Sequence, residues 1–119
     1  MQPENSDTAY LWDMLRYARM AVALVENLSI AAYAGDQTRQ LALERALEVV
    51  GESAGKVSQA FRADHPEIPW RKIIGLRNVL AHDYGNILQE RLWNVAVNHV
   101  PELIQSIEPL VPPEPTVAE

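Results

Sequence analysis

The chain has 119 residues, with ten Lys and Arg against sixteen Asp and Glu, and so carries a net charge of −6. This length fits a single domain, and the acidic balance argues against a general nucleic-acid-binding protein, which is usually basic. Because the chain has no cysteine, disulfides, thiolate zinc sites and a cysteine nucleophile are excluded.

No membrane segment is expected. The first residues lack the basic and apolar regions of a signal peptide, and the apolar stretch 20–34 is interrupted by Glu26, Asn27 and Ser29. We therefore expect a cytoplasmic location, one domain over residues 1–111 and a disordered proline-rich tail over 112–119.

The first half of the chain predicts two long helices. Ser6 or Asp7 is expected to cap the first helix, whose apolar residues recur at three- and four-residue intervals up to Val25. Residues 27–36 form a break with room for one short helical turn. The second helix is expected over 37–62, and its predicted buried stripe is Leu41, Leu43, Ala46, Leu47, Val50, Ala54, Val57 and Phe61.

The second half predicts two more helices. Pro69 suits the first turn of a third helix, which Gly85 and Asn86 would end. A fourth helix is expected over 88–110, with a kink near Pro101. Strand signals are absent, so the predicted fold is all-α, a four- to five-helix up-and-down bundle.

Residues 77–84, read Arg-Asn-Val-Leu-Ala-His-Asp-Tyr, are the most informative stretch for function. They place a permanent cation, a titratable base and a phenol within about two helical turns of an otherwise apolar segment. These groups can bind a phosphate and move a proton near it. The window 56–91 around them holds six basic and four acidic residues, whereas the rest of the chain carries a net charge of −8.

Ideal helix geometry separates the groups of this motif. Arg77 and Tyr84 lie about 20° apart around the helix axis, but Arg77 and His82 lie about 140° apart. Two arrangements could bring them together: a helix that frays before Gly85, or a two-fold axis that places the motif of a second chain against the first.

The motif and its flanks resemble the HEPN superfamily, and the HepT-like toxins in particular. The flanking segments are Gly51-Glu52-Ser53-Ala54, His65-Pro66-Glu67-Ile68-Pro69-Trp70-Arg71 and Gly75-Leu76-Arg77-Asn78, and the resemblance covers roughly residues 10–110. It implies a homodimer whose motifs meet at the interface. It also implies metal-independent RNA cleavage, in which His82 takes the proton of a ribose 2′-hydroxyl and Arg77 holds the phosphate.

The resemblance implies further roles. Asn78, Lys72 and Arg71 are candidates for supporting contacts with RNA. Tyr84 would be adenylylated by a minimal nucleotidyltransferase antitoxin, so that the added phosphate could pair with Arg77 and block the site. The chain would then be the ribonuclease toxin of a toxin–antitoxin system, with no cofactor. One departure from the family pattern is Gly85-Asn86, where relatives commonly carry an aromatic or aliphatic residue.

Plainer interpretations remain open at this point. Arg77 could pair with a carboxylate such as Glu52, and the chain could be a catalytically inactive HEPN-like dimer that binds nucleotide or protein. Gly51, Ala54 and Gly55 form a strip of small residues that predicts close packing, against a neighbouring helix or against the dimer partner. No two histidines share a metal-ligand spacing, so a metal site is not expected.

Overall fold

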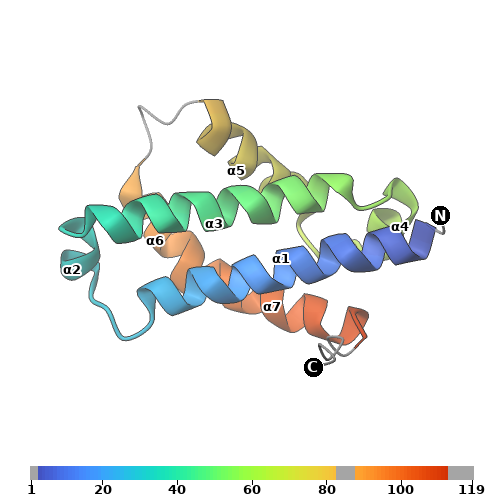
Figure 1. The fold of residues 1–119 in the computed structure, drawn as a ribbon, viewed down its shortest axis with the longest axis horizontal. Coiled ribbons are helices and arrows are strands. Elements are labelled where there is room, and N and C mark those ends of the chain that lie inside the picture. Colours follow the sequence, from blue (N-terminus) through green and yellow to red (C-terminus); the bar gives the residue numbers. More distant parts are fainter. Residues whose placement is uncertain (1–2, 83–87, 113–119) are drawn as a thin grey trace, which may run out of the picture.

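The computed structural model describes residues 3–82 and 88–112, and within these ranges the chain is helical and contains no strand. Helices α1 (Pro3–Val25) and α3 (Gln37–Lys56) run antiparallel and form the most extensive helix pair (Figure 1). Helix α5 (Trp70–His82) packs on α3, away from α1. The predicted all-α helical bundle is therefore confirmed.

The carboxy-terminal part of the chain covers the other side of α1. It consists of α6 (Gln89–Asn94), a π-helical turn (Val95–His99), α7 (Val100–Ile107) and a 3-10 turn (Glu108–Leu110). The π turn and α7 pack on α1, whereas α6 reaches α2 (Ile30–Ala34) and α3. The apolar side chains of α1, α3 and this segment form one continuous core.

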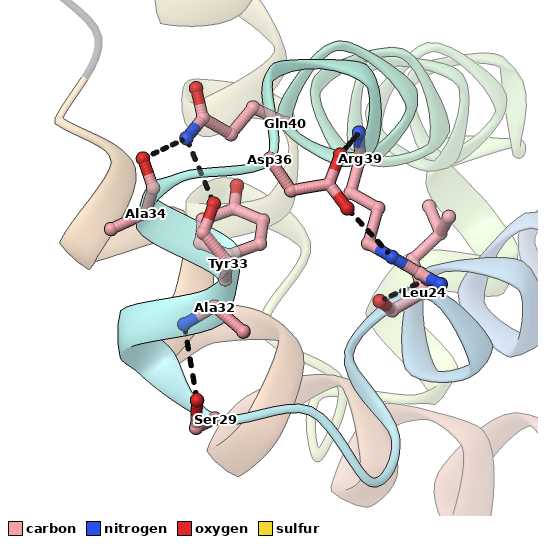
Figure 2. A network of polar contacts seen from close by, with 8 residues as sticks. All are labelled: Leu24, Ser29, Ala32, Tyr33, Ala34, Asp36, Arg39 and Gln40. Atoms are coloured by element: carbon pink, nitrogen blue, oxygen red, sulfur yellow. Dashed lines mark hydrogen bonds and ion pairs between the residues drawn. The ribbon is translucent and has the colours of Figure 1, made fainter.

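Polar contacts fix the corner between α1 and α3 (Figure 2). The Asp36 carboxylate caps α3 by accepting a hydrogen bond from the Arg39 amide at 3.0 Å. The Arg39 guanidinium pairs with Asp36 at 3.1 Å and donates to the Leu24 carbonyl at 3.0 Å. One arginine thus ties the start of α3 to the end of α1.

Helix α2 occupies the break that the sequence predicts between the two long helices. Ser29 caps it by accepting a hydrogen bond from the Ala32 amide at 3.1 Å. Gln40 of α3 donates to the carbonyl oxygens of Tyr33 (2.9 Å) and Ala34 (3.0 Å), which a helix leaves without internal partners at its end. The short helical turn is therefore confirmed and held from both ends.

The predicted second helix is wrong beyond Lys56. It ends there, and Ser58 caps a separate helix, α4 (Gln59–Asp64), by accepting a hydrogen bond from the Phe61 amide. The buried Asp7 carboxylate accepts hydrogen bonds from the Ser58 amide (2.8 Å) and hydroxyl (2.7 Å). The chain changes direction at this contact. Phe61 therefore belongs to α4, and its side chain is half-buried.

Two further expectations for the first half need correction. Helix α1 already begins at Pro3, so Ser6 and Asp7 lie inside it and do not cap it. Leu41, placed in the buried stripe of the second helix, is 59% exposed. The other members of that stripe on α3 are buried. The buried face of α3 is therefore narrower than the apolar pattern suggests.

The predicted kink near Pro101 takes the form of a π-helical turn. Proline has no amide hydrogen and its ring clashes with the carbonyl four residues earlier, so a regular α-helix cannot pass through it without distortion. The Val100 amide donates to the Val95 carbonyl, five residues back, and α7 starts with Pro101 in its first turn. The predicted stop at Gly85-Asn86 and residues 113–119 of the predicted tail lie outside the described residues.

Helices α3 and α5 cross at very short range. A Cβ atom on Gly51 would lie 2.3 Å from Arg77 Cβ and 2.8 Å from the Ile73 carbonyl oxygen. Only glycine fits there, because no side chain can occupy that space. A neighbouring helix therefore explains Gly51, whereas a Cβ on Gly55 would meet no atom within 4 Å.

A half-buried chain of hydrogen bonds connects α2, α6 and α3. The Tyr33 hydroxyl donates to Gln89 Oε1 at 2.5 Å, and Gln89 Nε2 donates to Glu44 Oε2 at 2.7 Å. Burial, followed by the nearby Glu44 charge, raises the pKa of Tyr33 to about 12 from its usual 10.0. This network fixes the start of α6, immediately after the segment that follows α5.

Tyr33→Phe should destabilise the fold by about 1–2 kcal/mol, since Gln89 Oε1 loses its donor. The pH dependence is diagnostic. Below pH 10 the Tyr33 phenol is neutral in both the folded and the unfolded protein. Between pH 10 and about 12 only the unfolded chain releases this proton, so the free energy of unfolding falls as the pH rises. Urea unfolding should show the wild type losing about 1.4 kcal/mol per pH unit there relative to Tyr33→Phe. If the free energy of unfolding changed with pH in the same way for the two proteins, the raised pKa of Tyr33 would be contradicted.

Gly51→Ala should displace α5 and cost about 1–3 kcal/mol of overpacking, less a gain of roughly 1 kcal/mol in helix propensity. Gly55→Ala on the same helix is the matched control, and it should be neutral or stabilising because its Cβ meets nothing. Thermal unfolding of the two variants measures the difference. Equal melting temperatures would mean that the close α3–α5 crossing is not required.

Candidate functional site

Arg77 lies on the face of α5 that packs against α3, above Gly51. Its Nε atom is buried and has no hydrogen-bond partner among the described residues. Its Nη1 atom is 3.4 Å from Asn78 Oδ1, which is long for a hydrogen bond. The helix crossing thus fixes the base of the side chain, while the guanidinium keeps its capacity to bind an anion.

The interpretation of Arg77 as half of a structural ion pair is wrong for the described part of the chain. Glu52, the carboxylate considered for that role, is 3.7 Å from Lys56 on its own helix. Arg77 forms no ion pair with any described carboxylate. A half-buried arginine without a counter-charge is costly to keep for stability alone.

His82 is the last described residue of α5 and is exposed. Because α5 is a regular helix from Trp70 to His82, Arg77 and His82 remain about 140° apart around its axis. Within one chain, therefore, the arginine faces α3 and the histidine faces away from it. Tyr84, the third member of the motif, lies outside the described residues.

The face of α5 that carries His82 also carries two of the supporting candidates. Arg71, Gly75, Asn78 and His82 fall within about 60° of one another around the helix axis. All four are exposed, and a Cβ on Gly75 would meet no atom within 4 Å. This outer face of α5 is thus accessible along its whole length.

A groove of about 830 Å³ runs between this face and α4. Its polar lining comes from Arg62, Arg71, Lys72, Asn78 and Gln59, and its apolar lining from Ala63, Pro66, Ile68, Pro69, Trp70, Ile74 and Gly75. The structure therefore brings together Arg71, Lys72 and Asn78, the three supporting candidates. Arg77 and His82 are not part of the lining.

Arg62 is a groove residue that the motif analysis did not single out. It extends from α4, and its Nε atom is buried without a hydrogen-bond partner in residues 3–82 and 88–112. The excess of basic residues over 56–91 was the available signal for it. That excess does not show which of these residues share a surface. Their placement depends on the separate helix α4, which Ser58 caps and which lines the groove opposite α5.

The ten basic residues divide sharply along the fold. Five pair with a carboxylate and lie on α1 or α3: Arg16, Arg19, Arg39, Arg45 and Lys56. The five that follow, on α4, α5 and α6, have no ion pair within residues 3–82 and 88–112: Arg62, Arg71, Lys72, Arg77 and Arg91. Among the described residues, positive charge is thus paired on the two long helices and unpaired on the helices that follow them.

No cluster of three or more metal-ligating side chains occurs in the described part of the chain. Among the same residues, no helix has both the length and the apolar character that a membrane span needs. The arrangement instead offers arginine, lysine, histidine and amide groups, which suit a phosphate-containing ligand.

Comparison with known proteins places the chain in a family. The family model described as "Ribonuclease HepT-like" matches residues 14–110. A protein of Methanocaldococcus jannaschii named "Putative RNase MJ1380" is 30% identical over 100 residues, which cover 84% of this chain and 92% of that protein. "Probable ribonuclease HepT" of Thermococcus cleftensis is 29% identical over 107 residues, or 90% of this chain and 97% of that protein.

A second protein of Methanocaldococcus jannaschii, "Putative RNase MJ0127", is 29% identical over 109 residues, covering 92% of this chain and 90% of its own length. No solved structure matches the chain significantly. The family match runs from the middle of α1 through the final 3-10 turn, so it includes every element that builds the groove and carries Arg77 and His82. The chain belongs to the HepT-like ribonuclease family.

Proposed function

We propose that this member of a ribonuclease family is a metal-independent endoribonuclease in which Arg77 and His82 act at a cleft between two copies of the chain. The observation that carries the proposal concerns the environment of Arg77. The helix crossing holds its side chain against Gly51, and no described carboxylate pairs with it. A guanidinium of this kind can bind a phosphate by a bidentate contact.

The divergence of Arg77 and His82 on α5 supports a dimeric site. One regular helix directs the two side chains about 140° apart, so a single copy does not direct both toward one phosphate. A two-fold axis near the end of α5 would place the arginine and histidine of both copies around one cleft. His82, at the end of the described part of α5, is exposed and leaves room for that approach.

The reaction balances without a further reagent. The neutral imidazole of one His82 accepts the proton of a ribose 2′-hydroxyl, and the 2′-oxygen attacks the adjacent phosphorus. The bond between phosphorus and the 5′-oxygen breaks, and the protonated His82 of the second copy supplies a proton to that oxygen. Arg77 stabilises the charge that develops on the phosphoryl oxygens. The products are a 2′,3′-cyclic phosphate and a 5′-hydroxyl end.

The biological setting belongs to the same proposal. We assign the chain to the toxin side of a cytoplasmic toxin–antitoxin pair, neutralised by a minimal nucleotidyltransferase that adenylylates Tyr84. Seven residues separate Tyr84 from Arg77, which is about 20° around an ideal helix axis, so an AMP on its hydroxyl would carry a phosphodiester toward the same guanidinium.

His82→Ala should lower kcat for RNA cleavage by about 10²–10⁴-fold, the usual worth of a general base, with the fold unchanged because His82 is exposed. His99→Ala removes another exposed histidine, in the π turn, and should retain full activity. The measurement is cleavage of a labelled RNA, with the 3′ end of the product tested for a cyclic phosphate. Equal activity in the two variants would remove His82 from the chemistry.

Arg77→Ala should abolish cleavage, and Arg77→Lys should restore little of it, because lysine cannot make the bidentate phosphate contact. The dimeric cleft is tested on the wild type. Specific activity should fall on dilution together with the fraction of dimer measured by light scattering. An active monomer would contradict the shared site, and intact RNA from a folded wild-type dimer would favour the inactive binding module.

Tyr84→Phe should remain toxic when the nucleotidyltransferase is co-expressed, because the hydroxyl that accepts AMP is gone. Tyr10→Phe, on α1, should be neutralised like the wild type and should gain the mass of one AMP. Growth curves and intact-mass spectra of the purified proteins read out both. Full neutralisation of Tyr84→Phe by the transferase activity would contradict the assignment.

A further inference from the structure

We infer that the groove between α4 and α5 is the subsite that binds the single-stranded RNA segment next to the scissile bond. This inference deepens the proposed ribonuclease function and rests on it. The motif residues Arg77 and His82 lie outside the groove lining, so the groove is a separate surface with its own chemistry.

The charge of the groove selects an anion. Three of its lining residues are cations, Arg62, Arg71 and Lys72, and no acidic residue in the described part of the chain lines it. Within the described ranges these three cations form no ion pair. In a chain with a net charge of −6, an unneutralised cluster of this kind is a local exception.

The positions of Arg71 and Lys72 point to binding rather than to stability. Both stand in the first turn of α5, which contains no acidic residue. The amino end of a helix carries partial positive charge, so cations there are unfavourable for the helix itself. A phosphate at this end would be attracted both by the two side chains and by the helix dipole.

The remainder of the lining fits a nucleobase better than a bare phosphate. Pro66, Pro69 and the half-buried Ile74 give the groove an apolar wall, next to the cations. Asn78, at the far end, offers an amide that can hydrogen-bond to a base edge. A ligand with an anionic backbone and flat apolar bases matches both parts of this lining.

The direction of the groove links it to the proposed chemistry. Arg71, Asn78 and His82 lie in that order on one face of α5, and His82 is one turn, about 6 Å, beyond Asn78. A strand bound by its phosphate at Arg71 and by a base near Asn78 would therefore continue toward His82. The groove would set the position of the strand, and hence the bond that is cleaved.

The test separates binding from cleavage and from folding. In the inactive His82→Ala background, Arg71→Gln/Lys72→Gln should weaken binding of a labelled single-stranded RNA oligonucleotide at least tenfold, measured by fluorescence anisotropy. Each lost phosphate contact should reduce the slope of log affinity against log salt by about 0.7, or about 1.4 for the pair. The melting temperature should not fall, since both cations oppose the dipole of α5.

Arg19→Gln/Arg45→Gln in the same background is the matched control. It removes the same charge from two exposed, ion-paired positions on α1 and α3. It should leave both the RNA affinity and the salt slope near those of the parent. Affinity and slope that fall equally in the two double variants would show only a net-charge effect, and would overturn the subsite.

Two further outcomes also overturn it. A change of oligomeric state in the groove variant, measured by light scattering, would assign the groove to an interface between copies. Inorganic polyphosphate of the same charge that binds as tightly as the RNA would exclude a contact with the bases.

The inference and the proposed function can fail separately. If the wild type cleaves RNA and the groove variant binds it normally, the subsite is wrong and the nuclease stands. If the groove variant loses RNA binding but the wild type leaves RNA intact, the groove stands as an RNA-binding site and the nuclease proposal fails.

Discussion

The close crossing of α3 and α5 at Gly51 is the constraint on which the site depends. Because no Cβ fits there, the backbone of α5 and the stem of Arg77 rest directly on α3. This contact fixes the rotation of α5 about its axis. It sets which side of the helix is buried and which side, bearing Arg71, Asn78 and His82, faces outward.

The basic residues also differ between the two long helices and the helices that follow them. The long helices α1 and α3 pair their arginines and Lys56 with carboxylates, so these charges are locally neutral. The helices that follow carry cations without such partners among the described residues. An acidic protein can therefore present a small positive surface, which favours a local phosphate contact over long-range attraction of a polyanion.

Periodicity in the sequence predicted the elements whose structure is set locally. The all-α class, the long helix ending at Val25, the short turn after it and the distortion near Pro101 all follow from apolar spacing or from proline chemistry. The end of α3 at Lys56 does not. The chain turns there, where Ser58 binds the Asp7 carboxylate 51 residues earlier in the chain, and no local pattern reveals this contact.

The site, too, depends on contacts between residues that are distant in the sequence. The motif identified Arg77 and His82 as chemically able groups, and helix geometry alone separated them around the axis. Only the fold shows that Arg77 rests on α3 and that Arg62 faces Arg71 across a groove. Asp7 and Ser58 also imply an order of folding. A six-residue helix such as α4 is too short to persist alone, so it should form only after α1 has docked on α3. The wall of the groove would then be completed late, and would open first when the native protein fluctuates.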